Sequence, residues 1–235
     1  MTTTVAIHQP NYLPYLGFFH KMALADTFIL YDTAQFSRND FHNRNRIKTP
    51  EGSSLLTVPF KRRGLLPIRA IEIDSAGGWN LKHWKAVNAN YARAAHFVSY
   101  REELKKMYEE VSTQLASVNE KFIRWIAGEW GIQPRILNAS DLPVPVTLSP
   151  SERLAHMVRE VGGDTYVSGV GGLEYLAAGA FRGLNLLLQD FRHPEYPQLW
   201  GPFVKNLSSI DLLLNVGEGG SDLIRGAGGT RSWPS

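Results

Sequence analysis

A strand, a proline-rich loop, a helix and a second strand follow one another in the first 36 residues, and this unit constrains the fold more than any other stretch. The apolar run Val5–Ile7 is typical of a short buried strand. Pro10 and Pro14 exclude a regular helix in the loop that follows. A helix is predicted from about residue 15 to 25, with Pro14 at or near its first position. Phe28–Tyr31 is predicted to form the second strand.

Polar residues follow both predicted strands. His8, Gln9 and Asn11 come after the first, and Asp32 and Gln35 come after the second. In an open parallel α/β sheet, ligands bind in the crevice beyond the carboxyl ends of the strands. If the two strands are parallel neighbours, these five side chains converge on one rim and form a site. Alternatively, they only cap backbone groups at turns.

Strands and helices alternate along the rest of the chain. Strands are expected at 55–60 and 68–74, paired as a hairpin, and at 134–138, 165–168 and 184–189; helices are expected at 79–94, 102–130, 150–161, 174–180 and 208–215. The fold class is therefore α/β, a three-layer Rossmann-like, mostly parallel sheet with an inserted β-hairpin and helical segment. We expect one domain over 1–217, with the insertion at about 50–130. Residues 218–235, rich in Gly and Ser, are expected to be a flexible C-terminal tail.

A second candidate site follows the strand 165–168. Gly169, Gly171 and Gly172 come directly after Ser168, and small residues let a backbone approach a ligand closely. The pattern is neither a Walker loop nor a complete dinucleotide fingerprint. Ser168 is either a hydroxyl nucleophile or a side chain that bonds to its own loop.

Basic residues gather in one part of the chain, although the net charge is only +3. Such a cluster indicates either an anion-binding surface or a solvated loop; it comprises Arg38, Arg44, Arg46, Lys48, Lys61, Arg62 and Arg63. Asn45 lies among them and offers both a donor and an acceptor. Lys82 and His83 lie in the first turns of a predicted helix, where a basic residue is unfavourable unless an anion binds nearby.

The sequence contains no cysteine, which excludes disulfides, thiolate metal sites and a cysteine nucleophile. No apolar run approaches the ~20 residues of a membrane span. The first residues lack the basic and apolar segments of a secretory signal, so a cytoplasmic protein without membrane contact is expected. No cofactor is expected. A metal site of His8, His20 and Asp32 is a remaining alternative, but these residues lack compact ligand spacing.

Several stretches together resemble the WbqC-like protein family. They are IHQPNYLPYLGFFHK at 7–21, NRNRIK at 43–48, LTVP at 56–59, Trp79 with Lys82 and His83, YVSG at 166–169, and LSSIDLL at 207–213. The resemblance spans residues 8 to 217. It implies a protein of bacterial surface-polysaccharide (O-antigen) gene clusters that transfers glycine or a similar amino-acyl or acyl group onto an amino sugar.

On this resemblance, the leading hypothesis is an acyltransferase acting on a nucleotide-linked sugar, with an acyl-carrier protein or aminoacyl-tRNA as donor. His8 is expected to be the general base, oriented by Asp32 or Gln35, with His20 as a second candidate. The candidate substrate-binding residues are Gln9, Asn11, Tyr12, Gln35, Arg44, Asn45, Arg46, Lys48, Lys82, His83, Ser168, Gly169 and Gly172. The alternatives are a nucleotidyltransferase that uses a nucleoside triphosphate and magnesium, and a non-catalytic module that binds an activated sugar or carrier protein. The oligomeric state is left open.

Overall fold

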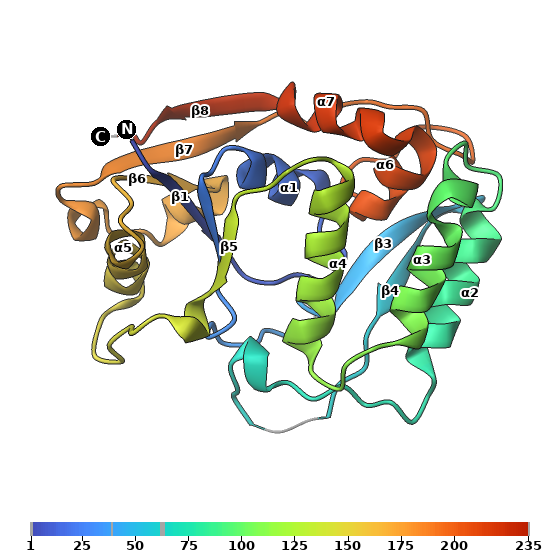
Figure 1. Cartoon of the computed structure of the whole chain (residues 1–235), viewed down its shortest axis with the longest axis horizontal. Coiled ribbons are helices and arrows are strands. Elements are labelled where there is room, and N and C mark those ends of the chain that lie inside the picture. The colour runs from blue at the N-terminus through green and yellow to red at the C-terminus, as the bar shows by residue number, and fades with distance from the viewer. Residues whose placement is uncertain (1, 39, 62–63, 235) are drawn as a thin grey trace.

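The computed structural model describes residues 2–38, 40–61 and 64–234, and its centre is a six-stranded sheet (Figure 1). The strand order is β5-β2-β1-β6-β7-β8. Five strands are parallel, namely β1 (Thr4–His8), β2 (Thr27–Leu30), β5 (Arg135–Asn138), β6 (Thr165–Ser168) and β7 (Asn185–Phe191). β8 (Gly228–Ser232) is antiparallel to β7. The predicted α/β class with a mostly parallel sheet is confirmed.

Successive side chains of the central strands enter different cores, because they point to opposite faces of the sheet. Val5 and Ile7 pack with α5 (Pro150–Glu160). Ala6 between them packs in a larger core with α1 (Leu16–Ala23). Figure 1 shows α5 on one side of the sheet and α1 and α4 on the other. The layers follow from the consecutive apolar residues in the middle of the central strands, since both faces of the sheet are covered there.

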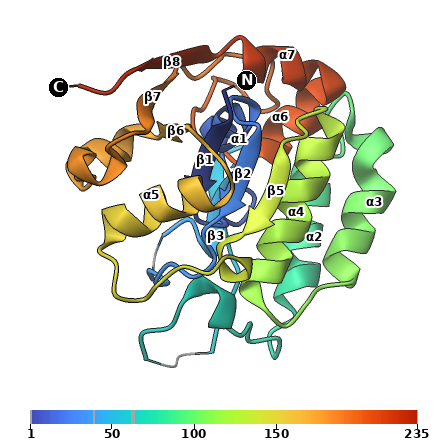
Figure 2. The same cartoon turned by 60° about the vertical axis from the view of Figure 1, so that its left-hand side comes forward.

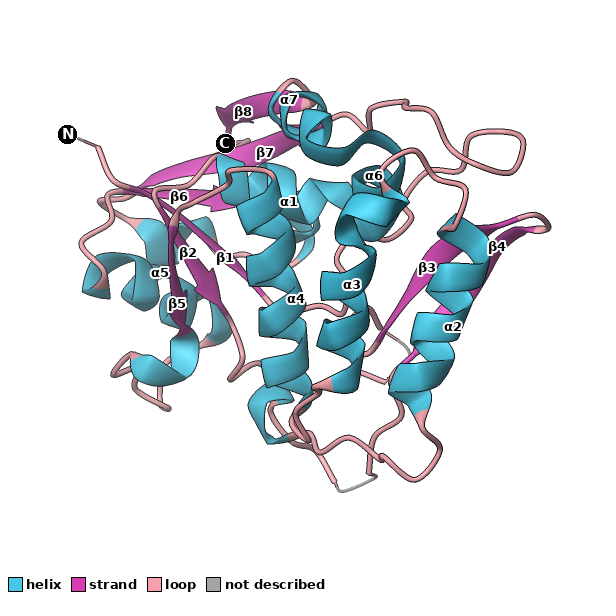
Figure 3. Cartoon of the chain, turned by 45° about the vertical axis from the view of Figure 1, so that its right-hand side comes forward, coloured by secondary structure: helices cyan, strands magenta, loops and turns pink. Residues whose placement is uncertain are grey.

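An insertion between β2 and β5 carries the hairpin of β3 (Arg44–Thr49) and β4 (Gly52–Thr57), followed by α2 (Trp79–Tyr91), α3 (Phe97–Glu109) and α4 (Leu115–Glu129). Figures 2 and 3 show these helices together, with α2 beside the hairpin. The predicted strand 68–74 is wrong in its first half, where Ile68–Ala70 is a 3₁₀ turn; at its end, Ile73 forms an isolated antiparallel bridge with Phe60. The partner of β4 is instead 44–49, where the exposed Arg46 alternates with the buried Asn45 and Ile47 in strand fashion.

Residues 218–234, predicted as part of a flexible tail, contain regular secondary structure. They form α7 (Gly220–Arg225) and β8, and they follow α6 (Ser209–Val216). A Cβ on Gly228 would lie 1.9 Å from the Asp190 carbonyl, so this glycine lets β8 approach β7 closely. The predicted helix 174–180 is also absent; Val170–Glu174 and Ala178–Phe181 are short 3₁₀ turns, in a glycine-rich stretch that disfavours an α-helix.

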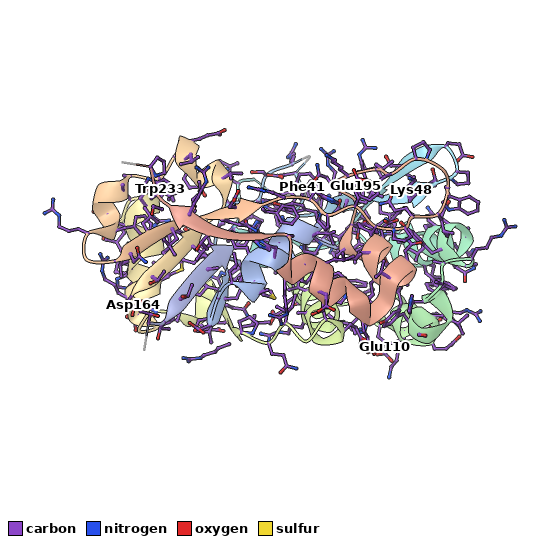
Figure 4. All side chains as sticks on the ribbon, turned by 90° about the horizontal axis from the view of Figure 1, so that it is seen from above. Phe41, Lys48, Glu110, Asp164, Glu195 and Trp233 are labelled. Atoms are coloured by element: carbon purple, nitrogen blue, oxygen red, sulfur yellow. The ribbon has the colours of Figure 1, made fainter. Side chains whose placement is uncertain are left out.

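The sheet and the hairpin occupy opposite ends of the long axis. In Figure 4, Asp164 at the start of β6 and Trp233 after β8 lie toward one end, and Lys48 of β3 lies toward the other. None of the helices in the described residues is long and apolar enough to cross a membrane.

Candidate functional site

The candidate site is a cleft of about 430 Å³ at the carboxyl ends of β1 and β6. β2 lies on one side of β1 and β6 on the other, so the order in which strands are added to the sheet reverses at β1. Ligands of open α/β sheets bind at such a switch point. The residues lining it come from β1, α1, β6, β7, α5 and the glycine-rich turn; they include Ile7, His8, Gln9, Tyr15, Lys21, Tyr31, Tyr166, Ser168, Gly169, Gly172, Tyr175, Gln189 and Phe191.

His8 ends β1 and lines this cleft with its ring held in one orientation. Nδ1 is 2.9 Å from the Gln9 carbonyl, so Nδ1–H donates and Nε2 carries the lone pair of the neutral ring. The ring meets Phe18 of α1 edge to face, with 4.8 Å between centroids. Burial, with smaller contributions from Lys21 and His42, lowers the pKa of His8 well below its usual value, against the opposing effect of the Gln9 carbonyl. His8 is therefore a neutral base at pH 7.

Gln9 connects the loop after β1 to a second histidine. His42 Nδ1 accepts the Ser37 amide proton at 3.2 Å, so His42 Nε2–H donates to Gln9 Oε1 at 3.0 Å. Asn119 of α4 donates to the carbonyls of Pro10 and His42 at 2.8 and 2.7 Å. These bonds attach the proline-rich loop to two other segments and preorganise the side chains at the end of β1.

Lys21 of α1 is the cation of the cleft, and the sequence did not indicate it. Its side chain is 5% exposed, and Nζ donates to the Ile7 carbonyl at 3.0 Å. Burial lowers the pKa of Lys21 to about 7. Neither Asp nor Glu lines the cleft within the described ranges. A lysine in such surroundings titrates near neutrality, which is unusual and typical of functional sites.

The turn after β6 forms the opposite wall. Ser168 Oγ donates to the Gly169 carbonyl at 3.0 Å, so the hydroxyl bonds to its own loop. A Cβ on Gly172 would lie 2.1 Å from Ser168 Oγ, which explains glycine at that position. A Cβ on Gly169 would lie 3.8 Å from Lys21 Nζ and 3.9 Å from Gln189 Oε1. Gly169 therefore keeps the space beside both polar groups open.

Four tyrosines surround these polar groups: Tyr15, Tyr31, Tyr166 and Tyr175. Tyr175 is 63% exposed, at the rim of the cleft. Burial raises the pKa of Tyr15, Tyr166 and Tyr175, so all three rings stay neutral at pH 7. Their faces suit stacking against a sugar or a base, and their hydroxyls add hydrogen-bond partners.

The structure separates Asp32 and Gln35 from His8. Asp32 accepts the Ser140 amide at 2.9 Å and the Ser140 hydroxyl at 2.7 Å, and it lines a different, smaller cavity beside Arg69. Gln35 is exposed and pairs with the segment at residue 67. The expectation that one of them orients His8 is wrong: the Gln9 carbonyl does so, because β2 directs its polar end toward the insertion.

His20 lies next to the cleft residues but packs between α1 and β7. Its Nδ1 accepts from Gln189 Nε2 at 2.8 Å, and its ring lies 5.3 Å from that of Phe191. Burial lowers the pKa of His20. His20 thus positions Gln189, which in turn lines the cleft.

Tyr12 and His83 belong to a buried cluster in the helical insertion. Tyr12 Oη lies 2.9 Å from His83 Nδ1 and 3.1 Å from Tyr108 Oη. Burial lowers the pKa of His83 to about 4, so this histidine is uncharged at pH 7. The prediction that His83 attracts an anion is therefore wrong, because the side chain carries no positive charge at this pH. Asn11 is also buried.

The basic residues of the hairpin lie away from the cleft. Arg46 is exposed and donates to Ser53 at 3.2 Å, whereas Asn45 is buried and donates to the Leu13 carbonyl at 2.6 Å. Lys48 is fully buried and donates to Gln198. Arg44 lies beside Arg46 in a small hollow. Arg38, Lys61 and Lys82 are exposed, and Arg62 and Arg63 lie outside the described residues. Of the predicted residues, the cleft brings together His8, Gln9, Ser168, Gly169 and Gly172.

The sequence signal that could have identified Lys21 is the composition of α1, LGFFHKMA, in which apolar residues lie on all sides of the helix. In the structure every residue from Leu16 to Met22 is buried, so α1 has no solvent face. A helix that is apolar on all sides is covered on all sides. Lys21 is the one charged residue of this helix, so burial of the helix implies burial of its charge.

The described part of the chain holds no group of three His, Cys, Asp or Glu side chains placed to bind a metal ion. The proposed trio of His8, His20 and Asp32 is divided among the cleft, the α1–β7 interface and the cavity beside Arg69.

The fold and cleft define an α/β protein with a polar site at the switch point of its sheet. The chain belongs to the WbqC-like protein family, whose model matches residues 9–222. It is 37% identical over 227 residues to the uncharacterized protein Rv1507c of Mycobacterium tuberculosis, covering 94% of this chain and 97% of that protein. No solved structure matches the chain.

Proposed function

We propose that this protein is a transferase that moves an acyl or amino-acyl group of the glycine type onto an amino group of a nucleotide-linked sugar, in the biosynthesis of bacterial surface polysaccharide or a related polymer. The observation that carries the proposal is the state of His8: a neutral imidazole, fixed through Nδ1 to the Gln9 carbonyl, at a cleft on the switch point. Family membership supports the substrate class.

The reaction needs only a base and a positioned donor. Nε2 of His8 removes a proton from the acceptor amine as its nitrogen bonds to the acyl carbonyl carbon. The bond from that carbon to the sulfur or oxygen of the donor then breaks, and the leaving group takes the proton from His8. An amide and a free thiol or hydroxyl result. The donor is an acyl-carrier protein or an aminoacyl-tRNA.

The shape of the cleft supports a sugar substrate. Its volume of about 430 Å³ falls in the range of small-molecule sites. Tyr31 and Tyr175 offer aromatic faces, while Ser168 and Gln189 offer polar groups. Because the pKa of His8 is lowered, we expect activity to persist below pH 6.5 and to fall only as the ring becomes protonated.

The test is an assay with nucleotide-linked amino sugars and glycyl or acyl donors, in which mass spectrometry detects the acylated sugar. We expect His8→Gln to lower turnover by about 10²–10⁴-fold, the usual contribution of a general base. The matched control is His156→Gln, since His156 lies on α5 and bonds to the Pro143 carbonyl. Unchanged turnover in His8→Gln would exclude the assigned base. Release of pyrophosphate from a nucleoside triphosphate with magnesium would instead identify a nucleotidyltransferase.

A further inference from the structure

The cleft contains a buried cation, Lys21, and none of the described residues that line the cleft carries the opposite charge. Lys21 Nζ donates to the Ile7 carbonyl, which accepts a hydrogen bond but carries no net charge. The cleft walls provide no carboxylate within the described ranges. A buried charge without an opposite charge is unfavourable for folding. The arrangement therefore costs stability that a lysine on the surface would not cost.

The position of Nζ makes it reachable from the cleft. Nζ lies 3.8 Å from the point where a Cβ on Gly169 would be, and Gln189 Oε1 lies 3.9 Å from the same point. Glycine thus leaves room for ligand atoms beside the ammonium group. Ile7, whose carbonyl accepts from Nζ, directly precedes His8, so the proposed base lies in the same neighbourhood.

We propose that Lys21 is the anion subsite of this cleft, and that it binds an oxyanion group of the substrate, a phosphate or a carboxylate, and takes up a proton as that group binds. The proposal rests on the function proposed above, for which a nucleotide-linked sugar supplies phosphate and an amino-acid donor supplies carboxylate. It identifies the group that recognises the charged part of the substrate.

Proton uptake follows from electrostatics. With a pKa of about 7, Lys21 is mostly uncharged at pH 8 when the cleft is empty. An oxyanion within about 4 Å favours the ammonium form and raises that pKa. The other ionisable groups that line the cleft are His8 from β1, Tyr15 before α1, Tyr31 after β2, Tyr166 of β6 and Tyr175 after the glycine-rich turn, and none of them is a carboxylate. Binding and protonation of Lys21 are therefore coupled.

The experiment is isothermal titration calorimetry at pH 8, in two buffers that differ in ionisation enthalpy, with inorganic pyrophosphate and with glycine as probes. For the wild-type protein we expect binding of one probe with uptake of close to one proton, and affinity that falls as the pH is raised further. Binding of pyrophosphate assigns the subsite to phosphate, and binding of glycine assigns it to carboxylate. Lys21→Met should weaken binding at least tenfold and abolish the proton uptake.

Lys85→Met is the matched control, since Lys85 is exposed on α2, and it should bind like the wild type. Thermal unfolding of each variant checks that the fold is intact, and replacing a buried lysine with methionine removes an unfavourable charge. Wild-type affinity in Lys21→Met, binding without proton uptake, or no binding of either probe at millimolar concentration overturns the proposal. These readouts do not use turnover, so a subsite that binds as expected in a protein without transferase activity would reject only the proposed function.

Discussion

Lys48 in the insertion and Lys21 on α1, beside the sheet, are both almost fully buried, and their surroundings differ. Lys48 Nζ donates to Gln198 Oε1 at 3.1 Å and to the Pro202 carbonyl. Gln198 Nε2 donates in turn to Asp211 at 2.8 Å. Asp211 also accepts the hydroxyl protons of Tyr91 at 2.7 Å and Tyr196 at 2.9 Å, so the network around Lys48 contains its own counter-charge.

Lys21 has one carbonyl partner, lines an open cleft and lacks a carboxylate among the described cleft residues. The comparison teaches that burial of a charge does not by itself indicate function. A buried cation whose opposite charge is part of the protein belongs to the fold, because its removal leaves that opposite charge buried and uncompensated. A buried cation that faces a cleft without one is available to a ligand.

The comparison predicts opposite effects for the same substitution. Lys48→Met removes the donor to Gln198 and the Pro202 carbonyl and takes the cation from the network around Asp211, and we expect a loss of about 3 kcal/mol in the free energy of unfolding. Lys21→Met removes a charge that has no carboxylate partner, and we expect a free energy of unfolding equal to or above that of the wild type. Urea denaturation of both variants at pH 7 measures the difference.

A double variant tests the cause. If the loss in Lys48→Met comes from the unpaired Asp211, then adding Asp211→Asn should cost much less in that background than in the wild type. Strictly additive effects would show that the two residues are not coupled. Equal destabilisation by Lys48→Met and Lys21→Met would remove the distinction between the two regions.

Local patterns in the sequence predicted most of the fold. Apolar runs identified β1, β2, β6 and β7, and the Ser149–Glu152 capping box, present in the structure, identified the start of α5. The strand 44–49 was missed because its Asn and Arg residues suggested a loop. The C-terminal strand was missed because its glycines serve close backbone approach, which only the packed sheet reveals.

The candidate site could be predicted only in part. The loop after β1 and the glycine-rich turn after β6 were identified, because ligands of open α/β sheets bind beyond the carboxyl ends of strands and the apolar runs show where those strands end. Composition could not distinguish Lys48 from Lys21, since the counter-charge of Lys48 comes from Asp211, more than 160 residues along the chain. The roles expected for Asp32 and His83 depended on neighbours that sequence spacing does not specify.

Acid unfolding extends the comparison to the histidines of the two regions. His83 is 6% exposed, and its pKa of about 4 lies below the 6.5 of an unfolded chain. The unfolded state therefore binds more protons, so the stability contributed by neutral His83 is present above pH 6.5 and is lost as the pH falls toward 4. The 2.5-unit difference corresponds to about 3 kcal/mol.

His83→Phe removes this titration while Tyr12 keeps its bond to Tyr108. We expect the free energy of unfolding of the variant, relative to the wild type, to rise by about 3 kcal/mol between pH 7 and pH 4. Denaturation at several pH values measures this relative change, since the other titrating groups are common to both proteins. Parallel pH profiles for the two proteins would show that His83 is not the buried neutral group described above.

The smallest effect is expected for Arg46→Ala. Arg46 is exposed on β3, and its guanidinium donates to Ser53 of the same hairpin, so the free energy of unfolding should change by less than about 0.5 kcal/mol. If the cleft binds phosphate through Lys21, the affinity for pyrophosphate should also stay within about twofold of wild type, because an exposed charge in another region is screened by solvent and salt. Calorimetry at physiological ionic strength measures both affinities. A tenfold loss in Arg46→Ala would instead place phosphate on the hairpin and would make the basic cluster, rather than the buried lysine of α1, the anion-binding region.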